Sequence, residues 1–429
     1  MIMLFRNLIK RLQTGEKVGI TSICSANEFV IRAAMIHAKE RKYSLLIEST
    51  SNQVDQFGGY TGMTPEMFKN YVFSIATEVD FPTNEIVLGG DHLGPNVWKK
   101  LDANVAMLNA KEQIKAYANA GYEKFHLDTS FILDGDEPIN GKLPPEVATL
   151  RAAELCEIAE MNYSSEQKPV YIIGTDVPVP GGAFDNEEII ETTTAEGLEQ
   201  TIELTKKAFY SKGLEDAWNR VVAVVVQPGV EFSDTKILQY SRERNRELIS
   251  KIEQYENIFF EAHSTDYQKP EDLRKMVEDH FVILKVGPWL TFALREALFA
   301  LSFIETELLK YRKDFVLSDL ISTLDKEMSA NPRYWKEHYK GNEDEIEIAK
   351  HFSYSDRIRY YWSNSTVQKS VQKLLNNLNS VEIPDTLISQ FLPNQYAELR
   401  SEKITKNPVD LINSKIFEVL SVYHVATGG

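Results

Sequence analysis

The chain has 429 residues, of which 43% are hydrophobic and 26% are charged, as in ordinary soluble enzymes. Its 47 basic and 63 acidic residues give a formal net charge of −16. This excludes the broad cationic surface that duplex nucleic acid or an anionic membrane requires. Cys24 and Cys156 are the only cysteines, which excludes a disulfide framework and a Cys-rich zinc module.

The first residues, MIMLFRNLIKRLQTGEK, predict a short amphipathic helix. Arg6, Lys10 and Arg11 interrupt the apolar residues that a signal sequence keeps together. No stretch approaches the roughly 18 apolar residues of a membrane span. We therefore expect a cytoplasmic protein with reduced cysteines, and neither nucleic acid nor a membrane among its partners.

Eight short runs of β-branched and apolar residues recur along the first 290 residues, and helix-like segments such as Asn104–Asn119 and Thr194–Ser211 lie between them. The runs are Val18–Cys24, Ser44–Thr50, Glu85–His92, Lys124–Ser130, Val170–Pro178, Val221–Gly229, Asn257–Tyr267 and Phe281–Pro288. Near-continuous apolar runs are typical of parallel strands covered by helices, and eight strand–helix units favour a closed barrel over an open sheet.

From about Trp289 onward the pattern is helical and rich in Tyr, Trp and charges. The sequence therefore predicts an α/β fold, a (β/α)₈ TIM barrel over residues 1–300. A C-terminal helical extension, residues 301–429, is expected to pack on the barrel.

The predicted strands begin apolar and end in polar residues. These strand-end residues are, in chain order, Glu48, Asp91, His92, His126, Asp128, Thr175, Asp176, Gln227, Glu261, His263 and Lys285. The carboxyl ends of barrel strands form the face that carries active sites. Residues two apart project to the same side of a strand, so His126 and Asp128 share a side, as do Glu261 and His263.

Three histidines at three strand ends, each within two residues of an acid, match the ligands that zinc, manganese, cobalt or nickel prefer. We predict a divalent metal ion held by His92, His126 and His263, with Glu261 as a candidate fourth ligand. Glu48, Asp91 and Asp128 are the predicted catalytic, proton-handling residues. For any single histidine, the alternative is a hydrogen-bonded core residue.

Further residues at the predicted mouth are expected to bind substrate. After Glu48, the loop SNQVDQFGGYTGMTP offers amides for hydroxyl contacts and aromatic rings for a lid. Phosphate is expected near the seventh and eighth strands, as in many barrel enzymes. Arg357 and Arg359, in SDRIRYYW, are further candidates that could reach over from the helical region. The predicted substrate- and phosphate-binding residues are Asn52, Gln53, Gly174, Thr175, Gln227, Glu231, Ser264, Lys285, Gly287 and Arg357. The VPVPGG segment after the fifth strand is expected to shape the rim.

Several long motifs resemble the GatZ/KbaZ family over nearly the whole chain: IESTSNQVDQFGGYTGMTP, GGDHLGPN, HLDTS, QPGVEF, EAHSTDYQ, LKVGPWLTFALREA and SDRIRYYW. The resemblance implies a barrel related to class II aldolases. Members are described as the non-catalytic, chaperone-like subunit of class II D-tagatose-1,6-bisphosphate aldolase, as tagatose-6-phosphate kinases, or as D-fructose-6-phosphate/D-tagatose-6-phosphate 4-epimerases. The sequence departs from the expected pattern at Ser49, Asp55 and Asp176, where Ala, Asn and Glu are expected.

A subunit that only stabilises a partner has no need of three histidines and four inward carboxylates. We therefore predict a metal-dependent enzyme that interconverts D-fructose 6-phosphate and D-tagatose 6-phosphate at C4, by retro-aldol/aldol or proton-transfer chemistry. The alternative is the aldolase subunit itself, in tagatose, galactitol or N-acetylgalactosamine catabolism. Expected partners are a phosphorylated ketohexose and either further copies of the chain or a class II aldolase subunit. A kinase fits least, because no GxxxxGK[ST] loop is present.

Overall fold

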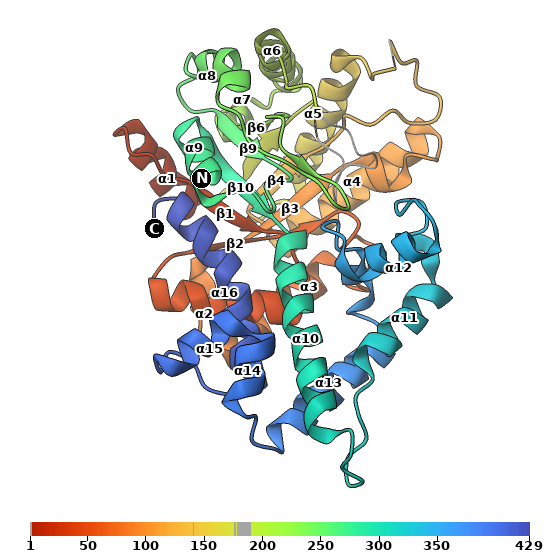
Figure 1. Ribbon diagram of the computed structural model, residues 1–429. Helices are drawn as coiled ribbons and strands as arrows, with labels where there is room; N and C mark the ends of the chain where they lie inside the picture. Colours follow the sequence, from red (N-terminus) through yellow and green to blue (C-terminus); the bar gives the residue numbers. More distant parts are fainter. Residues whose placement is uncertain (1, 140, 176, 178–189) are drawn as a thin grey trace.

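The computed structural model describes residues 2–139, 141–175, 177 and 190–429. Within this part, eight parallel strands close into a barrel in the order β1-β10-β9-β6-β5-β4-β3-β2 (Figure 1). They are β1 (Ile20–Ile23), β2 (Leu45–Thr50), β3 (Ile86–Leu93), β4 (Lys124–Leu127), β5 (Val170–Ile173), β6 (Val221–Val225), β9 (Phe259–Ala262) and β10 (Phe281–Val286). Each strand overlaps one of the eight predicted runs, with β3 ending one residue beyond its run, so the predicted (β/α)₈ barrel is confirmed.

Helices follow the strands and cover the barrel. They are α2 (Glu28–Arg41), α3 (Pro65–Glu78), α4 (Ala103–Ala120), α5 (Pro145–Asn162), α6 (Ala195–Ser211), α7 (Glu215–Trp218), α8 (Arg246–Ile252), α9 (Pro270–Glu278) and α10 (Pro288–Leu309), with 3₁₀ turns η1 (Thr83–Glu85), η2 (Pro95–Trp98) and η3 (Glu243–Asn245). Helix α3 shows why they start where they do. The Thr64 hydroxyl accepts from the backbone N–H of Met67, and Pro65 occupies the first helical position.

The alternation of strand side chains divides the apolar core in two. Outward-facing residues such as Phe125 and Leu127 belong to the large core that the surrounding helices share. Inward-facing residues such as Leu46 and Val170 form a second core with α1 (Met3–Gln13), whose Phe5 is among its buried members. Helix α1 is the amphipathic helix that the first residues predict. The barrel interior next to α1 is therefore apolar and closed, which leaves the carboxyl ends of the strands for polar groups.

The region after α10 is helical in the part described. It comprises α11 (Leu320–Ala330), η4 (Pro332–Tyr334), α12 (Glu343–Phe352), η5 (Arg357–Tyr361), α13 (Ser365–Asn379), α14 (Asp385–Phe391), α15 (Pro393–Arg400) and α16 (Pro408–Ala426). Helix α16 packs against α9, α10 and α2 (Figure 1), and the N–H of Gly19 donates to the carbonyl of Thr427 at 3.0 Å. This last helix therefore forms part of the barrel's outer wall. The expected boundary after residue 300 falls inside α10.

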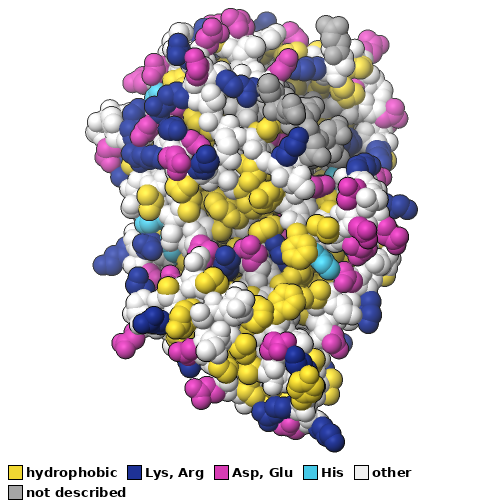
Figure 2. All heavy atoms as spheres, in the orientation of Figure 1, with side chains coloured by type: hydrophobic (Ala, Val, Ile, Leu, Met, Phe, Trp, Pro, Cys, Tyr) yellow, Lys and Arg dark blue, Asp and Glu magenta, His cyan; other side chains and the backbone are white. Residues whose placement is uncertain are grey.

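A short antiparallel hairpin, β7 (Glu231–Phe232) with β8 (Ile237–Leu238), follows β6 and has no counterpart among the predicted strands. Its turn is tied to the C-terminal region, because Asp234 Oδ1 accepts from the hydroxyls of Ser353 at 2.8 Å and Ser355 at 2.7 Å. Figure 2 shows acidic and basic side chains interspersed over one face, with hydrophobic side chains through its middle. None of the helices described combines the length and apolarity needed to cross a membrane.

Candidate active site

A layer of four charged side chains crosses the barrel interior above its apolar floor. Lys124 Nζ lies 2.7 Å from Glu48 Oε1 and 2.7 Å from Glu261 Oε2, and all three side chains are fully buried. Lys285 Nζ approaches Glu48 Oε2 at 2.9 Å, Glu261 Oε1 at 3.5 Å and Asp91 Oδ1 at 2.6 Å. Paired carboxylates and ammonium groups of this kind can remain charged without water.

Backbone register and a glycine bring Glu48 into this layer. Glu48 is paired with Gly89 across β2 and β3, and a Cβ at Gly89 would lie 2.7 Å from Glu48 Cγ. Real Cβ atoms do not approach that closely, so position 89 requires glycine to leave room for the carboxylate side chain.

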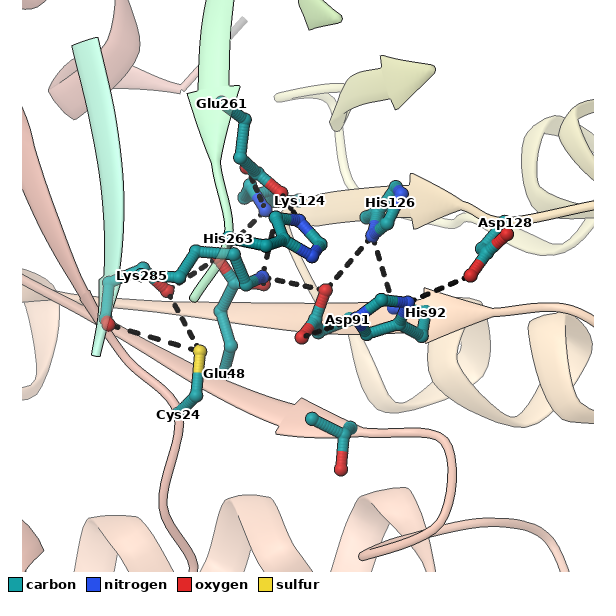
Figure 3. A network of polar contacts seen from close by, with 12 residues as sticks. Cys24, Glu48, Asp91, His92, Lys124, His126, Asp128, Glu261, His263 and Lys285 are labelled. Atoms are coloured by element: carbon teal, nitrogen blue, oxygen red, sulfur yellow. Dashed lines mark hydrogen bonds and ion pairs between the residues drawn. The ribbon is translucent and has the colours of Figure 1, made fainter. Parts of the chain in front are cut away.

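Above the charged layer lies a cluster of candidate metal ligands, Asp91, His92, His126 and His263 (Figure 3). One ligand atom from each lies within 4.8 Å of the others, and all four residues are buried. The residues come from three strand ends: β3 carries Asp91 and His92, β4 carries His126, and His263 follows β9. The structure thus brings together the three histidines that the sequence predicts as ligands.

Two carboxylates outside the cluster orient its histidines. Asp128 Oδ2 lies 2.8 Å from His92 Nδ1, and Glu261 Oε1 lies 3.0 Å from His263 Nε2. Each contact fixes one ring nitrogen as a donor and leaves the other as an acceptor, the arrangement common behind metal-bound histidines. Asp128 and Glu261 therefore orient candidate ligands, whereas Asp91, which we expected to handle protons, lies among the ligand atoms.

The hydrogen-bonding needs of the groups around His126 are not all met by the described residues. Its Nδ1 lies 2.9 Å from Asp91 Oδ1, which needs a donor, and 3.2 Å from the backbone N–H of His92, which needs an acceptor. Its Nε2 is buried without a hydrogen-bond partner among the described residues. Buried nitrogens without partners are rare, so this environment fits an additional cation or ligand.

The pKa shifts in the cluster point the same way. Burial lowers the pKa of His263 to about 3, which keeps its imidazole neutral, as a metal ligand must be. Burial would also lower the pKa of His92, but Asp91 and Asp128 outweigh it and raise that pKa. The space between these two carboxylates therefore favours positive charge.

Asp91 and Lys285 hold each other ionised. Burial would raise the pKa of Asp91, but His92, Lys285 and His126 hold it well below its usual range. In the same way burial opposes charge on Lys285, whereas Asp91 and Glu261 hold its pKa well above its usual range. The site thus holds four buried carboxylates, Glu48, Asp91, Asp128 and Glu261, and two buried lysines, Lys124 and Lys285. A divalent cation matches this excess of negative charge, so the residues present fit the predicted metal ion.

Backbone strain marks the rim of the cluster. His92 and Ser264 have φ angles of 48° and 53°, in the left-handed region that non-glycine residues seldom adopt. Such residues persist where surrounding contacts hold them, and they gather at functional sites. Here the turn at His92 directs its ring toward His126 and His263, whose centroids lie 5.1 and 4.7 Å away.

A cavity opens over the cluster. Of the expected substrate-binding residues, Asn52, Gln53, Ser264, Lys285 and Gly287 line it, together with Asp91, His92 and His263. The loop of residues 51–65, the expected lid and called the lid loop below, contributes Tyr60. The β7–β8 hairpin contributes Phe232, and the C-terminal region contributes Arg359 and Tyr360. The wall is therefore rich in amides, hydroxyls and aromatic rings, which suits a small polar ligand.

Other expected binding residues lie outside the cavity wall. Gly174 is buried at the end of β5, and the Thr175 hydroxyl lies 2.5 Å from that of Thr201. Gln227 Oε1 accepts from the N–H of Gly229 at 2.8 Å. Glu231 is buried beside Ser264, and burial raises its pKa to about 7. Asp176 and the segment 178–182 lie outside the described residues.

Three expected phosphate contacts are already engaged within the chain. Lys285 is surrounded by three carboxylates. The N–H of Gly287 donates to Asp266 Oδ1 at 3.0 Å. Arg357 Nη1 donates to the carbonyl of Tyr334 at 3.0 Å. Ser264 lines the cavity as well, and its side chain hydrogen-bonds Glu231.

Sequence reasoning missed Lys124, a fully buried residue of the charged layer. The signal was present, because Lys124, His126 and Asp128 alternate along one strand and therefore share its inward side. A lysine at the start of a strand resembles a flanking surface residue, which hid its place.

The protein is a barrel with a buried histidine–carboxylate centre at the carboxyl ends of its strands. This is the face on which barrel proteins bind small molecules. The chain belongs to the family described as D-tagatose-1,6-bisphosphate aldolase subunit GatZ/KbaZ-like, which it matches over residues 5–428. Membership connects it to sugar-phosphate metabolism and confirms the resemblance seen in the sequence.

Among solved structures, one shares this fold closely. A probable tagatose 6 phosphate kinase from Sinorhizobium meliloti 1021 is 44% identical, with a TM-score of 0.87, over 95% of this chain and 100% of that one. The YdjI aldolase from Escherichia coli K12 is 12% identical (89% and 100% covered, TM-score 0.39). Fructose-bisphosphate aldolase from Campylobacter jejuni is also 12% identical (88% and 95% covered, TM-score 0.43).

Proposed function

We propose that this protein is a metal-dependent enzyme that interconverts D-fructose 6-phosphate and D-tagatose 6-phosphate by inverting C4. The observation that carries the proposal is the buried cluster of three histidines and Asp91 at the floor of a polar cavity. A protein that only associates with a partner gains nothing from keeping such a cluster desolvated.

His92, His126 and His263 are the proposed metal ligands, since each presents a ring nitrogen to the cluster. A divalent ion held there would supply Lewis acidity toward a sugar carbonyl oxygen. Zinc, manganese, cobalt and nickel all suit this donor set.

Asp91 is the proposed acceptor of the C4 hydroxyl proton. Its Oδ1 is engaged by Lys285 at 2.6 Å and His126 at 2.9 Å. Its Oδ2 has one longer contact, 3.8 Å from His92 Nε2, and is the oxygen proposed to meet the substrate. The charged layer keeps this carboxylate ionised and fixed in direction, because Lys285 is itself held between Glu48 and Glu261. Asn52 and Gln53 on the cavity wall would bind sugar hydroxyls.

The reaction balances without an oxidant or reductant. Removal of the C4 hydroxyl proton lets the C3–C4 bond break, which gives an aldehyde at C4 and an enediolate over C2 and C3. Rotation of the aldehyde presents its other face, the C3–C4 bond re-forms, and the proton returns to the C4 oxygen. A cavity that retains both fragments epimerises, whereas one that releases them acts as an aldolase.

The test uses the full chain alone, stripped of metal and then given zinc, manganese, cobalt or nickel. With D-fructose 6-phosphate as substrate, we expect D-tagatose 6-phosphate to form with at least one metal. Metal content after dialysis should fall in His263→Ala and stay unchanged in His351→Ala, because His351 contacts Asp325 and lies outside the cluster.

The family description as an aldolase subunit supports one competing function. Absence of turnover with every metal, together with stimulation of a class II aldolase subunit by the added chain, would replace the epimerase by that subunit role. Retention of full metal content in His263→Ala would remove this histidine from the ligand set.

A further inference from the structure

The cavity needs a cationic group for the substrate's phosphate, and the positions near the last two strands do not supply one. Lys285 is enclosed by Glu48, Asp91 and Glu261. The first amides of α10 are also taken, because Asp266 Oδ1 accepts from the N–H groups of Gly287 at 3.0 Å and Trp289 at 2.8 Å. An internal carboxylate thus occupies the place where a phosphate would meet the start of this helix.

Arg359 lines the same cavity from the C-terminal region. Its Nη1 donates to the carbonyls of Ser355 and Asp356, and its Nη2 donates to the Tyr360 hydroxyl at 3.0 Å. A guanidinium has five N–H donors, so these contacts leave two donors unused among the described residues. Within the same residues, no carboxylate forms an ion pair with Arg359, unlike Lys285.

The turn that carries Arg359 is held rigidly against the barrel. Asp356, at a φ of 44°, precedes η5, and its Oδ2 accepts from the hydroxyl of Thr291 on α10 at 2.5 Å. The guanidinium carbon lies 4.5 Å from the centre of the Tyr360 ring. Pre-organisation of this kind lowers the entropic cost of forming charge-assisted bonds to an oxyanion.

The lid loop meets the same turn. The Tyr60 ring lies 4.9 Å from Tyr360 and 6.3 Å from Tyr334, and Tyr334 stacks on Tyr360 at 4.7 Å. Tyr60, Tyr360 and Arg359 all line the cavity. The aromatic contact therefore joins the barrel's lid loop to the C-terminal turn beside the guanidinium.

We propose that Arg359 is the phosphate anchor of this cavity, so that the C-terminal region supplies the specificity for phosphorylated over free sugars. The identity of the sugar rests on the proposed function, whereas the anchor itself rests on the geometry of Arg359. Its planar fork suits a phosphate, and the histidine cluster at the floor of the cavity is left for the sugar carbons.

Calorimetric titration of the metal-loaded full chain with D-fructose 6-phosphate and with D-fructose tests the anchor. Arg359→Gln is expected to weaken binding of D-fructose 6-phosphate by about 10- to 100-fold, as for loss of a charge-assisted contact, and to leave D-fructose unchanged. Arg333→Gln is the matched control, because Arg333 is exposed and stacks on Tyr334 outside the cavity wall. It should leave both affinities unchanged.

Two results would overturn the anchor: unchanged affinity of Arg359→Gln for D-fructose 6-phosphate, or an equal loss for both sugars, which would mean a structural role. If Arg359→Gln does not fold, Arg359→Lys gives the same comparison, with a smaller loss expected for the phosphorylated sugar alone. Turnover is measured on the same preparations. If binding of D-fructose 6-phosphate depends on Arg359 but no turnover occurs, the epimerase is refuted and the anchor stands. If turnover occurs but binding does not depend on Arg359, the anchor is refuted and the epimerase stands.

Discussion

Removal of the buried lysine in the charged layer should destabilise the whole barrel. Lys124 lies 2.7 Å from both Glu48 and Glu261 with no exposed surface. Lys124→Met keeps most of the side-chain volume but leaves Lys285 as the one ammonium group among the described contacts of both carboxylates. Loss of one partner from a buried ion pair costs about 3–5 kcal/mol, because the remaining charge is left without compensation.

The expected change in melting temperature follows from the length of the chain. Unfolding entropy is about 2.1 cal/mol/K per residue, or about 0.9 kcal/mol/K for 429 residues. A loss of about 3–5 kcal/mol therefore lowers the midpoint by about 3–6 °C. Differential scanning calorimetry of metal-free protein measures this shift without a contribution from bound ions.

A surface lysine provides the control. Lys111 pairs with Glu154 at 2.6 Å, but both side chains are more than one third exposed. Lys111→Met should change stability by about 1 kcal/mol or less, since solvent screens such pairs. In addition, Lys124→Met combined with Glu261→Gln should be less destabilised than the sum of the single variants. A midpoint for Lys124→Met within 1 °C of the parent protein's, roughly the spread of the control, would refute the idea that this pairing stabilises the barrel.

Two further predictions concern space and pH. Gly89→Ala should abolish metal binding and turnover in protein that still folds, because the added Cβ would lie 2.7 Å from Glu48 Cγ; unchanged metal content by mass spectrometry would contradict this. Burial raises the pKa of Asp356 from 3.8 to about 7, although Arg295 opposes the shift. Since this pKa is higher in the folded than in the unfolded state, the stabilisation is complete below pH 4 and is lost as the pH rises through 7. The melting midpoint of the parent protein relative to that of Asp356→Asn should therefore fall between about pH 4 and pH 7, and a constant difference would exclude the shift.

The strands and their ends could be predicted because both signals are local. Apolar runs mark strands, and polar residues such as His126 and His263 occur where the runs stop. The same alternation along β4 also contained Lys124, whose inward place follows once His126 is placed inside.

Side-chain positions in segments without a repeating apolar pattern could not be predicted. Arg357 and Arg359 lie in one 3₁₀ turn, and only the folded chain shows that Arg357 bonds to Tyr334 while Arg359 lines the cavity. The hydrogen bond from the Gly287 amide to Asp266 could not be predicted either, because it depends on a contact between two loops. Such irregular segments take their side-chain directions from tertiary contacts, which spacing in the sequence does not encode.

The place of α16 in the barrel wall has a consequence for how the protein is made. His37 on α2 bonds to Ser421 on α16 at 3.1 Å, 384 positions further along the chain. At a synthesis rate of about 5–20 residues per second, α2 leaves the ribosome roughly 20–80 s before its partner helix. During that interval the apolar side of α2 that α16 later covers stays open to solvent and to other nascent chains. The wall of this barrel can therefore close only after translation of α16. The partly folded chain that lacks α16 exposes apolar surface and is prone to aggregate.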